Sequence, residues 1–229
     1  KTDFILAQKR LVEQLIKEYG FIGISQADIT QKLTYWEPFT HKSTEWFDPE
    51  WMFGVKYGFD IVIANPPYVS AVNMKRWSKT YKSLFLTPYG SYDIYILFFE
   101  TSLDFLKQTG TLVFITSNKY FIADYAKKLR ALLINKTQII QLIDLADCKK
   151  VFENVLISPA ITILNKQVKQ DYLINVGLLK DNDLYSMSNI SFNLTTSTKL
   201  SDSIGGPYNI YFNKENRSLI QKLNLEDSS

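Results

Sequence analysis

The fold is decided by the stretch Phe59-Asp60-Ile61-Val62-Ile63-Ala64-Asn65-Pro66-Pro67-Tyr68. Its first half contains a short apolar run, residues 61–64, which is typical of a strand covered on both faces in a parallel sheet. Its second half, residues 65–68, is a turn that two prolines make rigid and that ends in an aromatic ring. Ligands of open α/β sheets bind beyond the carboxyl ends of the strands. The stretch therefore predicts a buried strand that leads directly into a binding site.

The turn has the groups needed to hold a planar amine. The amino group of a base or of a carboxamide is a poor nucleophile, because its lone pair is delocalised into the π-system. Asn65 offers a side-chain carbonyl and Pro66 a backbone carbonyl, so two acceptors can hold the two N–H groups and localise that lone pair. The prolines fix the acceptors in place before the substrate arrives, and Tyr68 offers a flat face for stacking. The alternative is an ordinary loop after a strand, since Asn-Pro and Pro-Pro are common in turns.

Composition limits the class of protein. The chain has 229 residues, 46% of them hydrophobic, which suffices for one sizeable core. Its net charge of +3 means that any basic surface is local. The single cysteine, Cys148, excludes an internal disulfide and a cysteine-based zinc site, and we expect no metal. Without a signal peptide or a run of about 18 apolar residues, we expect a cytoplasmic protein that does not enter a membrane.

Strand and helix patterns alternate along the chain and predict an α/β fold with right-handed crossovers. We expect a helix at the amino terminus, an aromatic-rich loop over 34–58 and an irregular basic segment over 69–90. Further helices are expected at 93–107 and 121–133, and further strands at 111–116, 139–145, 160–164 and 172–179. The Ser/Thr-rich residues 186–203 are expected to form a loop or linker.

Four stretches in this order resemble the amino-group DNA methyltransferases, in particular the gamma-type N6-adenine methylases of restriction-modification systems. The first is the Asn65-Pro66-Pro67-Tyr68 motif with its strand. The others are residues 92–100 (YDIYILFFE), residues 112–118 (LVFITSN) and residues 151–161, where VFEN precedes SPAI. The resemblance covers residues 44–166 and implies a partial Rossmann-like S-adenosylmethionine methyltransferase sheet. That sheet is expected to be mixed, with one antiparallel hairpin strand and helices on both faces.

The resemblance assigns roles to individual residues. Asn65 and the Pro66 carbonyl would hold the target amino group, and Tyr68 would stack on the adenine. Pro67 would lie near the cofactor S-adenosylmethionine, and Phe98 would lie against its adenine ring. A core position is the alternative for Phe98, because a phenylalanine at helical spacing is commonly buried. Phe152 would lie on or beside the flipped base.

One feature of the family pattern is missing. Methyltransferases of this kind begin with a strand and a glycine-rich loop that approaches the cofactor, whereas this chain has nine glycines and no G-x-G sequence. Together with the first residue, Lys1, this indicates a piece of a larger enzyme that is inactive by itself. Residues 1–168 are expected to be the carboxyl-terminal portion of the catalytic domain. Residues 169–229 are expected to extend toward a target-recognition domain.

The implied function is methyl transfer to a flipped adenine in double-stranded DNA, in a fused type II restriction-modification enzyme. The partners are the DNA and the rest of the same polypeptide, which supplies the cofactor-binding half upstream and the recognition domain downstream. A protein-glutamine or rRNA guanine methyltransferase is the first alternative, because both use a similar turn. A DNA-binding module with a vestigial motif is the second. For the basic residues of segment 75–82, phosphate contact and a solvated surface are both open.

Overall fold

The computed structural model describes residues 49–70, 73, 75–148, 158–180 and 192–210, and in addition Thr2, Leu6, Ala7, Arg10 and Gln14, which are helical. The chain divides into two compact units, Lys1–Gly54 and Val55–Ser229. In the first unit the structure describes the short helix α3 (Pro49–Phe53). The other residues of the predicted amino-terminal helix and most of the aromatic-rich loop lie outside the described residues.

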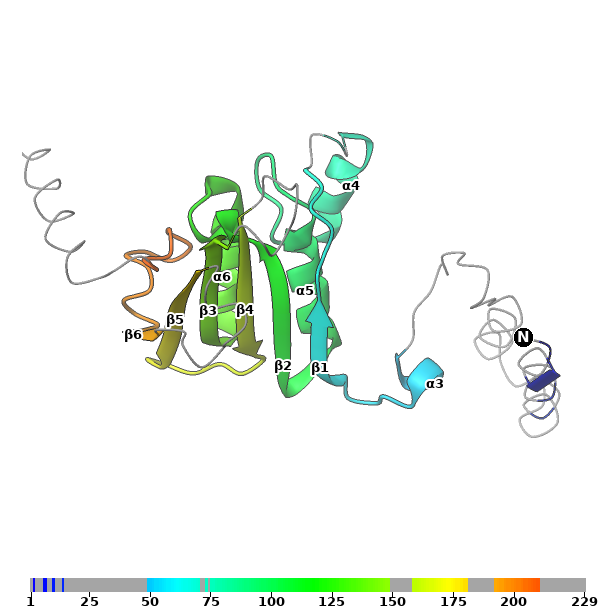
Figure 1. The fold of residues 1–229 in the computed structure, drawn as a ribbon. Coiled ribbons are helices and arrows are strands. Elements are labelled where there is room, and N and C mark those ends of the chain that lie inside the picture. Colours follow the sequence, from blue (N-terminus) through cyan, green and yellow to red (C-terminus); the bar gives the residue numbers. More distant parts are fainter. Residues whose placement is uncertain are drawn as a thin grey trace, which may run out of the picture. The chain divides into compact units, whose positions relative to one another are not determined.

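The second unit is built on a six-stranded sheet with the order β1-β2-β4-β3-β5-β6 (Figure 1). Its strands are β1 (Phe59–Ala64), β2 (Leu106–Ser117), β3 (Gln138–Asp147), β4 (Pro159–Asn165), β5 (Leu173–Lys180) and β6 (Phe192–Thr196). Its helices are α4 (Lys75–Leu84), α5 (Tyr95–Phe105) and α6 (Lys127–Lys136), with the 3-10 turns η2 (Asn118–Phe121) and η3 (Asp124–Ala126).

The sheet is mixed. β1 is parallel to β2, and β3 is parallel to β5. β4 lies between β2 and β3 and is antiparallel to both, as the predicted hairpin requires. β6 is a second antiparallel strand, paired with β5, whereas a single antiparallel strand was predicted. The predicted loop over 186–203 is also wrong at residues 192–196, which form β6. Hydrogen bonds from β5 order a polar segment that has little strand signal of its own. The predicted α/β class is confirmed.

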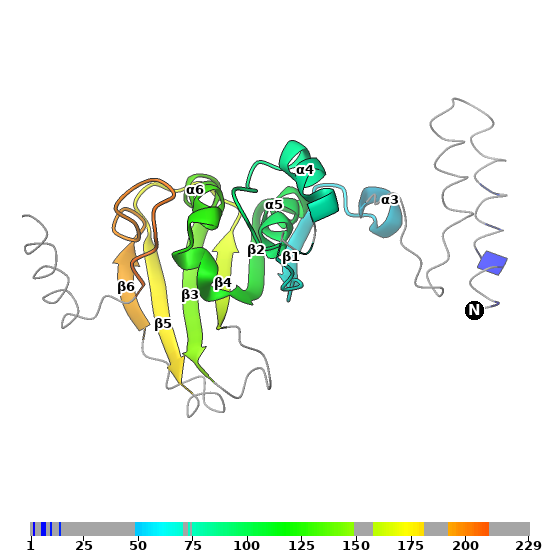
Figure 2. The ribbon, with the colours of Figure 1, turned by 90° about the horizontal axis from the view of Figure 1, so that it is seen from above.

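The hydrophobic core lies between the sheet and the helices α5 and α6, which cover the same face (Figures 1 and 2). Phe114 of β2, Phe99 of α5 and Leu129 of α6 are fully buried there. On β1, Val62 and Ala64 pack against this core, whereas Ile61 and Ile63 are 59% and 73% exposed. The prediction that both faces of β1 are covered is therefore wrong for the described residues. Helices on both faces of the sheet stay a prediction.

Two helical segments differ from the sequence prediction. Residues 75–84, expected to be irregular, form the helix α4, whose Tyr81 packs against the core. The expected helix over 121–133 begins later, at α6, because Phe121 enters the core from the turn η2. That turn is capped by Ser117, whose Oγ accepts a hydrogen bond from the Lys119 nitrogen at 3.3 Å. Tertiary packing has overridden the local pattern in both segments.

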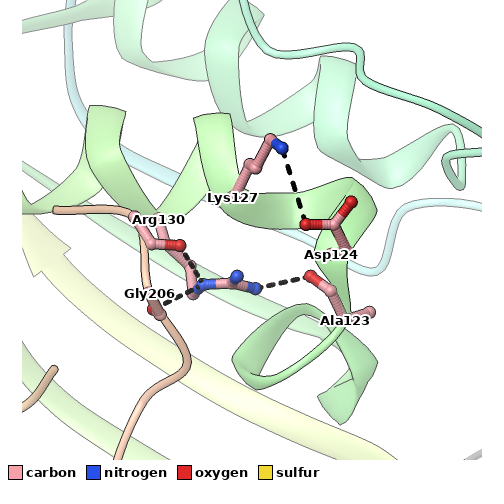
Figure 3. A network of polar contacts seen from close by, with 6 residues as sticks. Ala123, Asp124, Lys127, Arg130 and Gly206 are labelled. Carbon is pink, nitrogen blue, oxygen red and sulfur yellow. Dashed lines mark hydrogen bonds and ion pairs between the residues drawn. The ribbon is translucent and has the colours of Figure 1, made fainter. Parts of the chain in front are cut away.

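Described segments beyond residue 168 contact the sheet and α6. β5 is hydrogen-bonded to β3, and the later segment 200–210 is held by Arg130 of α6. The Arg130 side chain, 1% exposed, donates from Nε to the carbonyls of Gly205 (3.0 Å) and Gly206 (2.7 Å). It also donates from its terminal nitrogen to the carbonyls of Tyr120 (2.8 Å) and Ala123 (2.7 Å). Figure 3 shows the contacts of Arg130 with Ala123 and Gly206. Residues 173–180 and 200–210 are thus attached to the sheet and to α6, and the assignment of residues 169–229 as an extension toward a recognition domain stays a prediction.

We expect Arg130→Ala to lower the free energy of unfolding by at least about 3 kcal/mol, because hydrogen bonds to a charged group contribute about 1.5–3 kcal/mol each. Lys128→Ala is the matched control on the same helix, since Lys128 is exposed; its effect should stay within about 0.5 kcal/mol. Urea unfolding curves measure both. Equal effects of the two substitutions would show that Arg130 does not hold segment 200–210 to α6.

Candidate active site

The position of the motif follows from close packing at the start of β1. Gly58 has a φ of +92°, and a Cβ there would lie 2.7 Å from the Lys107 nitrogen, so this position requires glycine. From Gly58 the strand runs beside β2, with Ile63 opposite Val113 and Ala64 opposite Phe114. Asp60 and Lys107 add an ion pair between the two strands. The turn that follows Ala64 therefore begins at the carboxyl end of β1.

The four motif residues alternate between anchored and accessible positions. Pro66 is buried and Tyr68 is half-buried, whereas Asn65 and Pro67 are exposed. The side-chain carbonyl of Asn65 is thus accessible to a ligand, on a backbone that Pro66 holds in the protein. This is the arrangement expected of an acceptor fixed before binding.

Tyr68 is fixed at both ends. Its ring packs against the hydrophobic core, and its hydroxyl donates to the Ile115 carbonyl of β2 at 3.3 Å. Burial raises the pKa of the Tyr68 hydroxyl, so this group stays protonated at neutral pH. Directly after the motif, the Val69 carbonyl accepts from the Ile94 nitrogen at 2.8 Å, and Ser70 forms a bridge with Asp93. The motif is therefore attached to β2 and to the segment before α5.

A polar pair that the sequence analysis did not single out lies at the same edge of the sheet. Asn118, just after β2, donates from Nδ2 to the two carboxylate oxygens of Asp144 in β3, at 3.1 and 3.3 Å. The Asn118 nitrogen also donates to the Ser158 carbonyl at 2.8 Å. Asp144 is 2% exposed. The sequence offered one signal for this pair. Asp144 is a carboxylate within the apolar run of β3, and a buried carboxylate requires a hydrogen-bond partner.

Phe98 is at the surface. It is 38% exposed on α5, whereas its neighbours Leu97 and Phe99 are 4% and 0% exposed. The core alternative for Phe98 is therefore excluded. Phe152 lies outside the described residues. No cluster of three or more His, Cys, Asp or Glu side chains in the described part of the chain could hold a metal ion. No helix among the described residues is long and apolar enough to cross a membrane.

Comparison with known protein families identifies the chain. The model of the Eco57I restriction-modification methylases matches residues 4–152, which include the motif and Phe98. The chain belongs to this family. The predicted resemblance to restriction-modification methylases is thus confirmed, and the cofactor that the family implies is S-adenosylmethionine. An exposed ring at position 98 and an exposed Pro67 are compatible with that cofactor.

Two curated relatives are similar to this chain over about half of its length. The type II methyltransferase M.XhoI of Xanthomonas vasicola is 34% identical over 120 residues, 50% of this chain and 21% of the relative. The type II restriction enzyme and methyltransferase RM.Eco57I of Escherichia coli is 31% identical over 115 residues, 48% of this chain and 11% of the relative. This chain thus corresponds to about a fifth or less of these relatives. Among solved structures, the type IIG restriction endonuclease BpuSI has 18% identity and a TM-score of 0.43, over 60% of this chain and 19% of that protein.

The Tyr68 hydroxyl gives a prediction at alkaline pH. Its folded-state pKa is raised above the usual value of about 10, so its stabilising contribution is complete below about pH 10 and is lost as the pH rises through the raised pKa. In Tyr68→Phe, the free energy of unfolding should therefore fall less steeply above about pH 10 than in the wild type. Urea unfolding between about pH 8 and 11 measures the slope, and Tyr57→Phe, at an 80% exposed tyrosine, is the control. Parallel slopes for wild type and Tyr68→Phe would contradict a buried hydroxyl.

Proposed function

We propose that the protein is an adenine-specific DNA methyltransferase of the cytoplasm. It transfers a methyl group from S-adenosylmethionine to the exocyclic amine of an adenine that is flipped out of double-stranded DNA. The observation that carries this proposal is the accessible Asn65, held at the carboxyl end of β1 by the buried Pro66. Membership of a restriction-modification methylase family supports DNA as the substrate.

The chain's own residues bind and orient the amine. The side-chain carbonyl of Asn65 and the backbone carbonyl of Pro66 accept its two N–H groups, so the nitrogen lone pair becomes available for the new bond. When bound, S-adenosylmethionine would supply an electrophilic methyl group whose bond to the sulfonium sulfur breaks as the N–C bond forms, and the amine would release one proton to solvent. Because the acceptors are already in place, they stabilise the positive charge that develops on nitrogen.

Tyr68 and Phe152 hold the flipped base. Flipping costs a few kcal/mol, and stacking of a base on an aromatic ring contributes about 1–3 kcal/mol. The Tyr68 ring is suited to this role because its hydroxyl is tied to Ile115 of β2, which fixes the plane of the ring. A second ring at Phe152 then offsets most of the remaining cost.

Cofactor binding combines Phe98 and Pro67 with residues from the rest of the polypeptide, which supplies the glycine-rich loop. The chain described here is thus inactive by itself. We further propose that residues 169–229 lead toward a target-recognition domain and that a nuclease is fused to the same protein. The relative RM.Eco57I, named as both restriction enzyme and methyltransferase, supports the fused arrangement.

Asn65→Ala should abolish methyl transfer to adenine in duplex DNA and leave DNA binding nearly intact, because the substitution removes one acceptor for the amine and no packed side chain. The assay follows transfer of a labelled methyl group to duplex DNA by the full-length protein, with electrophoretic mobility shift as the binding measurement. Asn73→Ala is the control, since Asn73 is an exposed asparagine outside the motif.

Unchanged methylation by Asn65→Ala would refute the assignment. Digestion of the labelled DNA to nucleosides identifies the acceptor base. A label on cytosine would refute adenine specificity alone. Methylation of protein glutamine or of rRNA, with none on DNA, would establish the first alternative.

Phe98→Ala should raise the Kd for S-adenosylmethionine about ten-fold, because a contact between two aromatic rings contributes about 0.5–1.5 kcal/mol beyond the area that it buries. Calorimetric titration of the full-length protein measures this Kd. Ile122→Ala is the control at another exposed apolar side chain, 60% exposed. An unchanged Kd in Phe98→Ala would exclude the adenine contact.

A further inference from the structure

The helix α4, which follows the motif, carries an unbalanced positive charge. Its sequence KRWSKTYKSL contains four basic residues and no acidic one. Arg76, Lys79 and Lys82 are exposed, and we call these three residues the basic face of α4. Their spacing of three residues places them along one side of the helix. Among the described residues, none of the three has a carboxylate partner.

The opposite side of α4 holds the helix in place. Tyr81 packs against the hydrophobic core, as does Phe85 just after the helix, and their rings contact each other at 6.3 Å between centroids. The chain that follows is tied to α5, because the backbone nitrogens of Leu86 and Thr87 donate to the Glu100 carboxylate at 2.8 and 2.9 Å. The basic face is therefore held outward by contacts on its reverse side.

The basic face lies close to the motif along the chain and in space. Only six residues separate Tyr68 from Lys75, and Ser70 within this link is bridged to Asp93. Figure 1 shows α4 beyond the carboxyl end of β1, on the side of the sheet where the motif begins. The nearby carboxylates are engaged elsewhere: Glu100 binds the chain after α4, and Asp93 accepts from the Tyr125 hydroxyl at 2.8 Å.

Trp77 adds an aromatic surface to this helix. It is 52% exposed, and the Arg76 guanidinium lies 5.6 Å from the centre of its ring. An exposed ring next to cations is common where proteins contact nucleic acids, because the cations bind phosphates and the ring packs on sugars or bases. A membrane surface would favour large apolar side chains between the cations, whereas the exposed Leu84 and Leu86 lie at the end of α4 and after it, beyond Lys82.

We propose that the basic face of α4 binds the phosphate backbone of the DNA duplex next to the flipped adenine. This inference rests on DNA being the substrate in the proposed function and adds the surface that receives it. Phosphate contacts position a duplex without reading its sequence. The helix thus orients any duplex toward Asn65, while sequence recognition is left to other parts of the protein.

The test is the salt dependence of DNA binding by the full-length protein carrying Arg76→Gln and Lys79→Gln. Each phosphate contact contributes about 0.9 to the slope of log Kd against log salt, so the slope should fall by about 2. At about 0.1 M salt the affinity should fall roughly ten-fold or more, equally for duplexes with and without the target sequence. Fluorescence anisotropy without cofactor measures both quantities.

Two further variants make this result specific. Lys136→Gln with Lys169→Gln removes two exposed lysines and should leave the slope unchanged. Lys136 is the last residue of α6 and Lys169 lies between β4 and β5, at the end of the sheet opposite to the motif. Arg76→Lys with Lys79→Arg keeps the charges and should restore binding. A thermal unfolding midpoint equal to that of the wild type shows that the Gln variant is folded.

Equal slopes for the α4 variant and the control would overturn the inference, even if the wild type methylates adenine. A reduced slope in a protein that methylates no DNA would instead support the α4 surface and refute the proposed function. A reduced slope that the charge-keeping variant does not restore would also overturn the inference, because it would show that the positive charge is not the cause.

Discussion

The pairing of β1 with β2 is the constraint on which the site depends. Among the described strands β1 has β2 as its partner, and the pairing brings Ala64 opposite Phe114. A shift by one residue would exchange the two faces of β1 and would expose Val62 and Ala64 in place of Ile61 and Ile63. It would also move the hydroxyl of Tyr68 away from the Ile115 carbonyl. Gly58 secures the register, because any larger residue there would collide with the start of β2.

The structure separates rigid support from accessible chemistry. Pro66 is buried and Tyr68 packs against the core, whereas Asn65 is exposed on the same turn. A buried Asn65 would be shielded from substrate, whereas a fully solvated turn would have to be ordered on binding at a cost of about 1–2 kcal/mol per residue. Alternating buried and exposed positions avoid both the shielding of Asn65 and the entropy cost of ordering the turn. Asn118, just after β2, and Asp144 of β3 form a comparable polar connection across the intervening strand β4 at the same end of the sheet.

Much of this arrangement could be predicted from the sequence, for reasons that differ between elements. The strands β1, β2, β3 and β4 have apolar runs bounded by turn residues, and the sequence identified all four. It did not identify α4, since four basic residues gave a mean polarity typical of a loop and the contacts of Tyr81 and Phe85 with the core are made across long sequence separations. β6 was missed for the same reason, because it is formed by hydrogen bonds to β5 and not by its own sequence pattern. The exposure of Ile61 and Ile63 was missed because an apolar run does not reveal whether a strand lies at the edge of a sheet.

For the site itself, the sequence identified the candidate residues, and the structure showed which of them are accessible to a ligand. The motif named Asn65 and Tyr68 by residue type alone, whereas only the fold shows that one is exposed and the other anchored. Phe98 is the clearest case, because helical spacing favoured a core position and the structure places the ring at the surface between two buried neighbours. An exposed aromatic ring has a hydration cost that the fold of this chain does not remove. Its exposed position on α5 is compatible with the proposed cofactor contact.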